Sequence, residues 1–68
     1  MKKIYIIYRI ENEERKLYSM TDSLNSFVVL ASNLRKRGVE FVSEEVFEKD
    51  LDDEQADQWA YINSGMED

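Results

Sequence analysis

The sequence contains neither histidine nor cysteine. These residue types supply the commonest general base, the thiol nucleophile and most zinc ligands, so their absence excludes Ser-His-Asp and Cys-His catalysis and the usual zinc sites. Paired carboxylates could still perform acid–base chemistry. However, a chain this short without a glycine-rich loop has little room for a pocket that would desolvate one of them. We therefore expect a binding protein that is not an enzyme and uses no cofactor.

Proline is absent, glycine is scarce, and no apolar run approaches the roughly 18 residues that a membrane-spanning helix needs. The first two absences predict short connections between elements. The basic start Met1–Lys3 is not a signal peptide, because the apolar stretch after it ends at Arg9 and no small-residue cleavage site follows. We expect a cytoplasmic protein that does not associate with membranes.

The 68 residues suffice for one domain, near the lower limit for folding without disulfides or metals. We expect this domain to span residues 1–63 and residues 64–68 to form a disordered tail.

Three segments are predicted to be strands. Residues 2–10 carry apolar side chains on both faces, which is typical of a central strand covered on both sides. Residues 15–20 are the predicted hairpin partner, across a polar turn at Glu11–Glu14 that lacks the Asn-Gly signature. Residues 39–48 predict a third strand, whose alternation breaks at Ser43–Glu45. We interpret the break as a β-bulge, with a short second hairpin as the alternative.

Residues 22–37 predict the first helix. Thr21 or Asp22 is expected to cap its first turn, and Gly38 to adopt the left-handed conformation after its last turn. Six of its seven apolar side chains fall within one arc of about 160°, which should face the core. The arc consists of Leu24, Phe27, Val28, Leu30, Ala31 and Leu34.

Residues 53–63 predict the second helix, with Asp52 as its N-cap and Gln55 three positions later. Its inner face should consist of Ala56, Trp59, Ala60 and Ile62. The expected order is therefore ββαβα. This is an α+β fold in which a three-stranded, mainly antiparallel sheet of order 2-1-3 packs with two helices. The sequence does not indicate which face of the sheet the second helix covers.

Charge is distributed unevenly along the chain. Residues 1–37 have eight cationic and four acidic side chains, a net charge of +4, whereas residues 38–68 have one cationic and eleven acidic side chains, a net charge of −10. The segment Glu44–Asp57 is the most crowded, with eight carboxylates and one lysine. Such crowding destabilises a small domain. We interpret the segment as a surface for a basic partner; the alternative is a solvated face that keeps the domain soluble.

The proposed partner-binding residues are seven of these carboxylates and Tyr61, which the helical wheel places beside Glu54 and Asp57 as an aromatic anchor. The carboxylates are Glu44, Glu45, Glu48, Asp52, Asp53, Glu54 and Asp57. No metal site is expected. A calcium loop that starts at Asp50 would place Gln55 where glycine is needed and Tyr61 where the bidentate glutamate belongs.

The outer face of the first helix is unusual, because no charged residue occurs from Ser23 to Leu34 in a chain that is 35% charged. Small uncharged side chains lose little entropy on burial, so we interpret this face as covered, by the second helix or by a partner. The alternative is a plain polar face with one tolerated valine. The candidate dimer face consists of Asn25, Val29, Ser32 and Asn33.

Three functions are compatible with these patterns. The first is a small accessory or regulatory protein that docks on a basic protein surface and can compete with nucleic acid for it. The second is a homodimeric structural module that associates through the uncharged helix face or through an open side of the sheet around Tyr5 and Ile7.

The third is weak nucleic-acid binding by Arg35–Arg37 together with the cations of residues 2, 3, and 15 or 16. The net charge of −6 and the absence of a nucleic-acid-binding motif disfavour direct nucleic-acid binding. Capping of the helix end explains the three cations without a ligand.

Overall fold

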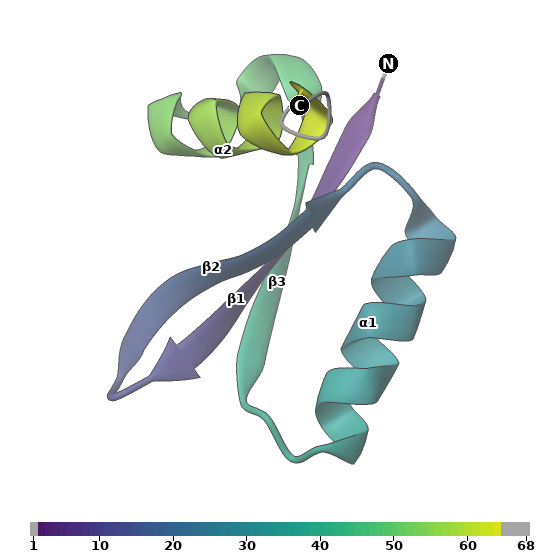
Figure 1. Ribbon diagram of the computed structural model, residues 1–68, viewed down its shortest axis with the longest axis vertical. Coiled ribbons are helices and arrows are strands. Elements are labelled where there is room, and N and C mark those ends of the chain that lie inside the picture. The colour runs from purple at the N-terminus through teal and green to yellow at the C-terminus, as the bar shows by residue number, and fades with distance from the viewer. Residues whose placement is uncertain (1, 65–68) are drawn as a thin grey trace.

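The computed structural model describes residues 2–64 and contains three strands and two α-helices in the expected order. The strands are β1 (Lys3–Glu11), β2 (Glu14–Thr21) and β3 (Phe41–Phe47), and the helices are α1 (Leu24–Lys36) and α2 (Asp53–Ser64). A single 3₁₀ turn, η1 (Glu48–Asp50), joins β3 to α2 (Figure 1). Apart from Ser64, which ends α2, the tail expected at residues 64–68 lies outside the described residues.

The sheet is antiparallel throughout and has the order β2-β1-β3, which confirms the predicted topology. The central strand β1 holds the most deeply buried side chains, since Ile4, Ile6 and Ile7 are all fully buried. Its apolar residues on both faces therefore reflect two covered faces, as expected for a central strand.

The β1–β2 hairpin closes through a two-residue turn. Asn12 has φ 53° and Glu13 has φ 67°, so both central residues are left-handed, as a type I′ turn requires. Asparagine tolerates this conformation well, whereas a glutamate in it is strained.

The prediction of a β-bulge in the third strand is wrong. The register of β3 against β1 runs without a shift from Phe41 to Phe47. The irregularity lies in β2, where Ile7 pairs with Ser19 and Tyr8 with Leu17, so that Tyr18 is the extra residue. The alternation in β3 breaks for a different reason: Glu44 occupies an inward position as part of a polar network.

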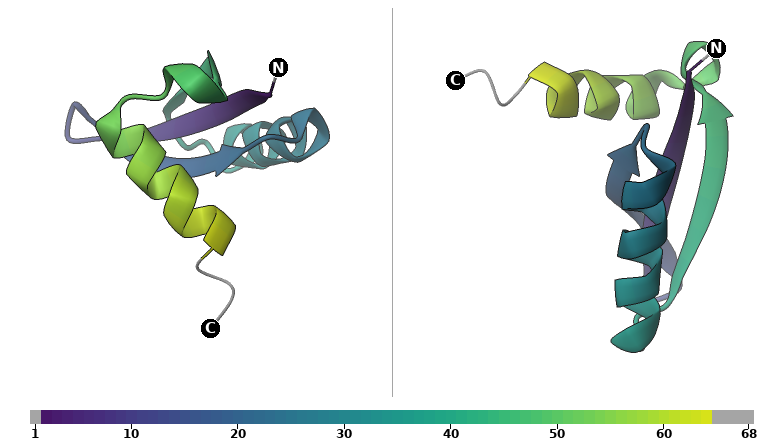
Figure 2. Two further views of the ribbon diagram at one scale, coloured as in Figure 1. Left: turned by 90° about the horizontal axis from the view of Figure 1, so that it is seen from above. Right: turned by 90° about the vertical axis from the view of Figure 1, so that its right-hand side faces the viewer.

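The two helices cover opposite faces of the sheet (Figures 1 and 2). On one face, Ile6 packs with Met20 and with Trp59 of α2. On the other, the ring of Tyr5 stacks on Phe27 of α1, with centroids 5.2 Å apart. Because successive strand residues point to opposite faces, these contacts place α1 and α2 on different sides.

Both ends of α1 are capped. Ser23 is the N-cap and accepts a hydrogen bond from the Ser26 amide, which corrects the expected choice of Thr21 or Asp22. The Thr21 hydroxyl instead accepts from the Ser23 amide at 3.1 Å and so orients the capping residue. At the other end Gly38 has φ 74°, as predicted.

The C-terminal end of α1 is a Schellman motif. The Gly38 amide donates to the Arg35 carbonyl and the Val39 amide donates to the Leu34 carbonyl, both at 3.0 Å. This motif reverses the chain direction and starts β3 two residues later.

The buried stripe of α1 is narrower than predicted. Ala31 and Leu34 are buried and Phe27 is half-buried, but Leu24 and Val28 are 55% and 54% exposed. The predicted arc is wider than the line along which one helix rests on a sheet. α2 could have covered Leu24 and Val28 at the side of this line, but α2 lies on the opposite face of the sheet.

The capping of α2 matches the prediction and its inner face does not. The Asp52 carboxylate accepts from the Gln55 amide at 2.8 Å, and the Gln55 side-chain oxygen accepts from the Asp52 amide at 3.1 Å. Among residues 53–62, Gln55 and Trp59 are the buried ones. The other three predicted inner residues, Ala56, Ala60 and Ile62, are exposed.

The reason is the position of α2. The helix crosses one end of the sheet, and its C-terminal half extends past the strands (Figure 2). Only its first two turns meet the sheet, so only the side chains of those turns that point inward are buried.

Candidate functional site

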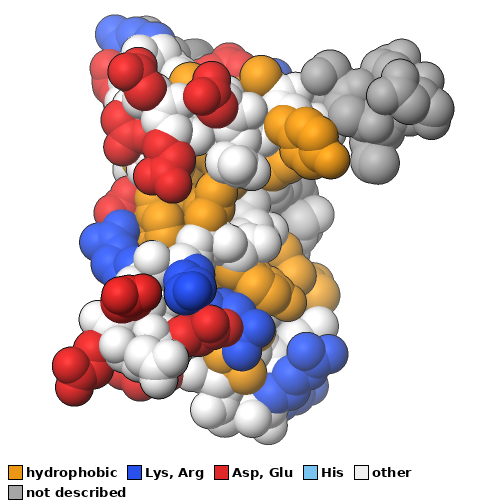
Figure 3. All heavy atoms as spheres, turned by 60° about the vertical axis from the view of Figure 1, so that its left-hand side comes forward, with side chains coloured by type: hydrophobic (Ala, Val, Ile, Leu, Met, Phe, Trp, Pro, Cys, Tyr) orange, Lys and Arg blue, Asp and Glu red, His pale blue; other side chains and the backbone are white. Residues whose placement is uncertain are grey.

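The candidate site is the exposed acidic surface at the start of α2. We call it the acidic end, and it consists of six carboxylates in η1, at the N-cap of α2 and in the first turns of α2: Glu48, Asp50, Asp52, Asp53, Glu54 and Asp57. All six residues are exposed, and the only cation in the same segment is Lys49. Figure 3 shows acidic side chains gathered over the upper part of the molecule, where α2 lies.

The other two predicted contact carboxylates, Glu44 and Glu45, belong to β3 and are not part of the acidic end. They are neighbours in β3, so their side chains point to opposite faces of the sheet. Glu44 faces α2 and accepts from the Arg15 guanidinium at 2.8 Å. Glu45 points to the α1 side and forms an ion pair with Lys3 at 3.4 Å. Both charges are balanced within the fold.

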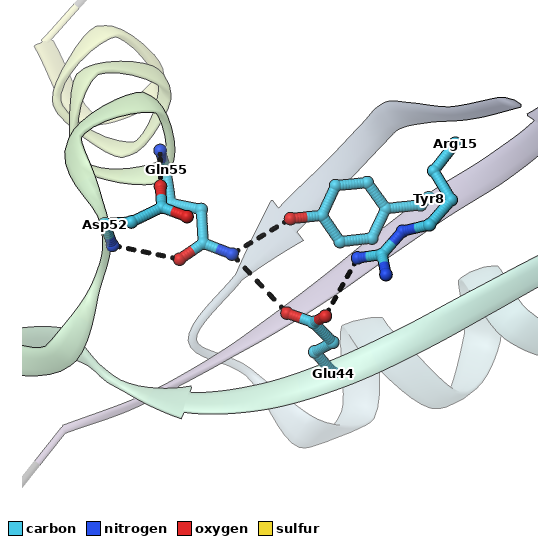
Figure 4. Close-up of polar contacts among 5 residues, drawn as sticks. All are labelled: Tyr8, Arg15, Glu44, Asp52 and Gln55. Carbon is cyan, nitrogen blue, oxygen red and sulfur yellow. Dashed lines mark hydrogen bonds and ion pairs between the residues drawn. The ribbon is translucent and has the colours of Figure 1, made fainter.

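A polar network joins the sheet to the acidic end (Figure 4). The Gln55 side-chain nitrogen donates to the Tyr8 hydroxyl at 2.9 Å and to Glu44 at 3.4 Å. The Arg15 guanidinium lies 4.2 Å from the centroid of the Tyr8 ring. Its hydrogen bond to Glu44 raises the pKa of Arg15 above the ordinary arginine value. The network therefore connects all three strands with α2.

Gln55 uses both ends of its amide. The oxygen completes the cap with Asp52, and the nitrogen reaches Tyr8 and Glu44. The capping pattern in the sequence identified the first role. No sequence signal identified the second, because it depends on residues that are distant in the chain. As a result the first turn of α2, with its carboxylates, is held at a defined place on the sheet.

Trp59 fixes η1 against α2. Its indole nitrogen donates to the Glu48 carboxylate at 2.9 Å, and the Glu48 amide donates to the Lys2 carbonyl at 2.9 Å. Glu48 is thus a structural anchor as well as a surface charge. Asp52 likewise serves as the N-cap.

The remaining four carboxylates of the acidic end have no such role. Within residues 2–62, no ion pair involves Asp50, Asp53, Glu54 or Asp57. Near them, Tyr61 is 72% exposed, the largest exposure among the large hydrophobic side chains of that part of the chain. The structure thus presents uncompensated negative charge on η1 and α2, and an accessible aromatic ring on α2.

The outer face of α1 is not covered by α2. Val29 is 58% exposed, Asn25 and Asn33 are exposed, and Ser32 is half-buried. A surface depression of about 440 Å³ lies on this face, lined by Asn25, Ser26, Val29 and Leu30. Since Leu24 and Val28 are exposed as well, the face is more apolar than the sequence indicated. The side of the sheet around Tyr5 and Ile7 is not open, because α1 covers it.

The basic residues are divided and largely engaged. Lys2 pairs with Asp22 at 3.6 Å, and the Arg35 guanidinium lies 5.8 Å from the centroid of the Phe41 ring. The N-terminus of β1 and the C-terminus of α1 lie at opposite ends of the molecule (Figure 1). Residues 2 and 3 of the expected basic patch are therefore far from Arg35–Arg37.

Within the described residues, no group of three or more carboxylates is arranged to hold a metal ion. In the same part of the chain, none of the helices is both long and apolar enough to cross a membrane. Comparison of the chain with protein-family models, with curated proteins and with solved structures found no match.

Proposed function

We propose that this chain is a small accessory or regulatory protein that docks on a basic protein surface through the acidic end, with Tyr61 as an anchor. The observation that carries the proposal is the group of four exposed carboxylates without an ion pair in residues 2–62: Asp50, Asp53, Glu54 and Asp57.

The helix dipole accounts for only part of this group. Acidic side chains in the first turn of a helix are stabilised by its positive end, and Asp53 and Glu54 lie there. Asp50 precedes the helix and Asp57 follows its first turn, so the dipole favours them less. A basic partner would neutralise all four.

A basic protein surface that binds carboxylates can also bind the phosphates of nucleic acid, so nucleic acid is the expected competitor of the acidic end. Surfaces that bind nucleic acid are basic because they neutralise phosphates. A protein that covers such a surface with carboxylates would exclude nucleic acid from it. Competition with nucleic acid is therefore the mechanism that we propose for regulation.

The test neutralises the acidic end without changing side-chain size. The variant Asp53→Asn, Glu54→Gln, Asp57→Asn is compared with the control Glu13→Gln, Glu14→Gln, Glu40→Gln, which changes the net charge equally at exposed positions elsewhere. Proteins captured from a lysate of the native host should be lost with the first variant and kept with the control. Retention of the same proteins, with the same salt sensitivity, by the acidic-end variant would disprove the proposal.

Two further measurements test the mechanism and the role of Tyr61. Double-stranded DNA or RNA added to the captured complex should release the partner if the acidic end occupies a nucleic-acid site. Tyr61→Ala should weaken binding by about 2 kcal/mol if the ring is a central anchor, whereas Tyr61→Phe should keep most of the affinity.

Self-association is a second candidate function, favoured by the exposed, charge-free face of α1. Leu24, Val28 and Val29 are each more than half exposed there. A helix-to-helix dimer would bury them, and Val29→Glu should dissociate it without unfolding the chain. Sedimentation of the wild type and the variant provides the test. Direct nucleic-acid binding has less support, because the basic residues are divided between two ends of the molecule.

A further inference from the structure

The two edges of the sheet differ in how open they are. β2 is interrupted by the extra residue Tyr18 and carries Arg15 and Lys16. Bulges and cations of this kind protect edge strands from pairing with another chain. β3 is regular, contains no cation, and has no strand on its outer side among the described residues. Figure 2 shows that neither helix lies beyond this outer edge.

The hydrogen-bond pattern determines which residues of β3 face outward. The Ile10 amide donates to the Glu40 carbonyl, and the Glu48 amide donates to the Lys2 carbonyl. The even-numbered residues between Glu40 and Glu48 therefore direct their backbone groups towards β1. Since the direction alternates along a strand, the backbone groups of residues 41, 43, 45 and 47 point to the open edge.

The sequence of β3 is nearly the same in both directions. Read forwards it is Phe-Val-Ser-Glu-Glu-Val-Phe, with Glu44 at its centre. In an antiparallel pair centred on Glu44, Phe41 lies opposite Phe47 of a second copy, and Val42 lies opposite Val46. Ser43 then lies opposite Glu45. The outward backbone groups of residues 41, 43, 45 and 47 face one another in this register, so the ladder is complete.

Burial favours the same arrangement. Val42 and Phe47 are 40% and 42% exposed although they belong to a strand. Cross-strand apolar and aromatic pairs of this kind stabilise a sheet. The pairing would cover Val42 with Val46 on the α2 face and Phe47 with Phe41 on the α1 face.

The charges of β3 select a second copy over a basic peptide. Glu44 is already hydrogen-bonded to Arg15 at 2.8 Å, and Glu45 is paired with Lys3. Neither carboxylate is therefore free to pair with a basic peptide. In the dimer, the two Glu44 side chains can lie side by side, because each is already hydrogen-bonded to Arg15 of its own chain. Antiparallel pairing also brings η1 of one copy towards the basic end of α1 in the other, which is complementary in charge.

We propose that β3 pairs with β3 of a second copy, antiparallel and centred on Glu44, so that two three-stranded sheets join into one of six strands. The paired strands do not include Asp53, Glu54 or Asp57 of the acidic end. The variant Asp53→Asn, Glu54→Gln, Asp57→Asn should therefore leave the dimer intact, and failure of the docking proposal would not affect this one.

A single-cysteine experiment tests the register, since the chain has no cysteine of its own. The two copies of residue 44 would form a non-hydrogen-bonded pair with Cα atoms about 4.5 Å apart, within disulfide range. Under mild oxidation Glu44→Cys should give a disulfide-linked dimer much faster than Lys16→Cys on the exposed edge of β2. Equal rates would overturn the proposal, and faster linkage of Val29→Cys would assign the contact to α1 instead.

Sedimentation of Ser43→Pro gives an independent measurement. The Ser43 amide points outward, so proline removes a donor at the interface and leaves the β1–β3 ladder intact. We expect the wild type to be dimeric and the variant's dissociation constant to rise at least about tenfold, with unchanged circular dichroism. A monomeric wild type at high micromolar concentration would overturn the proposal. Protection of the β3 edge only on addition of a different protein would also overturn it. If Ser43→Pro does not fold, the disulfide-linking rates of the cysteine variants still test the proposal.

Discussion

Among residues 2–64, Glu13 has the backbone conformation that is least suited to its side chain. It occupies the second central position of the hairpin turn with φ 67°. Both central positions of a type I′ turn are left-handed, and glycine or asparagine normally fills them. The residue is exposed, so the backbone alone determines how well it fits.

Glu13→Gly should therefore stabilise the domain by about 1 kcal/mol, because it removes the strain of a left-handed glutamate and loses no contact of a buried side chain. Asn12→Gly is the matched control and should give a smaller gain, since asparagine already tolerates this conformation. Urea denaturation measures both changes in the free energy of unfolding. A lower free energy of unfolding for Glu13→Gly would show that the Glu13 side chain stabilises the fold by more than its left-handed backbone conformation destabilises it.

Gln55 is a second residue whose role can be tested by a single atom change. Glutamate is a good residue for a capping box, but at this position the side chain also donates to Tyr8 and Glu44. Gln55→Glu would replace that donor with a second carboxylate beside Glu44 in a buried site.

We expect Gln55→Glu to destabilise the domain by about 1–3 kcal/mol at neutral pH, in spite of the favourable cap. Burial and Glu44 would raise the pKa of the new carboxyl in the folded state above its unfolded value. The folded state then binds a proton more tightly, so stability is recovered at acidic pH and is lost as pH rises through the folded pKa. Urea titrations at several pH values, with wild type as the control, measure this slope.

At the scale of elements, the connection from α1 to β3 depends on one glycine. Gly38 has φ 74° in the Schellman motif that ends α1. A Cβ at this position would meet no atom within 4 Å. Any cost of substitution is therefore conformational and not steric.

Gly38→Ala should destabilise the domain by about 1 kcal/mol, because alanine disfavours the left-handed conformation. Gly38→Asn should cost less, since asparagine adopts it more readily. Thermal unfolding of the two variants measures the difference. Equal and negligible effects would mean that the chain reverses direction without the left-handed residue.

The two helices also differ as elements. α1 lies along the sheet, and Phe27, Ala31 and Leu34 form its contact line. α2 is held in its first two turns by Gln55 and Trp59, and the rest of the helix extends past the strands (Figure 2). An extended helix end with an exposed aromatic ring is suited to contact with a partner.

For the whole molecule, this arrangement predicts a gradient of local stability. Amides of Ile4, Ile6 and Ile7 in the central strand should exchange with solvent only on global unfolding. Amides in the last turns of α2 should exchange at least about a hundredfold faster, because few buried contacts hold them. Hydrogen exchange followed by NMR measures both. Equal protection in the two regions would show that α2 unfolds only together with the sheet.

The charge asymmetry of the chain is reduced in the folded molecule. Lys2 and Lys3 belong to the basic part of the sequence, yet they lie beside η1 and β3, where Lys3 pairs with Glu45. The negative surface is therefore smaller than the segment Glu44–Asp57 suggested, and it is concentrated at the acidic end.

Local interactions explain what could be predicted from the sequence. Three features depend only on residues within a few positions of one another: the element order, the Asp52–Gln55 cap and the left-handed Gly38. They could therefore be predicted without a structure. The sheet order follows from the short connections and the doubly apolar first strand.

Tertiary structure alone decided the face that α2 covers, the narrow buried stripe of α1 and the pairing of Glu44 with Arg15. Each of these depends on how elements far apart in the chain are rotated against one another. A helical or strand period determines which residues share a face. It does not determine which of several apolar or charged faces meets a neighbour, because that choice depends on the combined packing of all the elements.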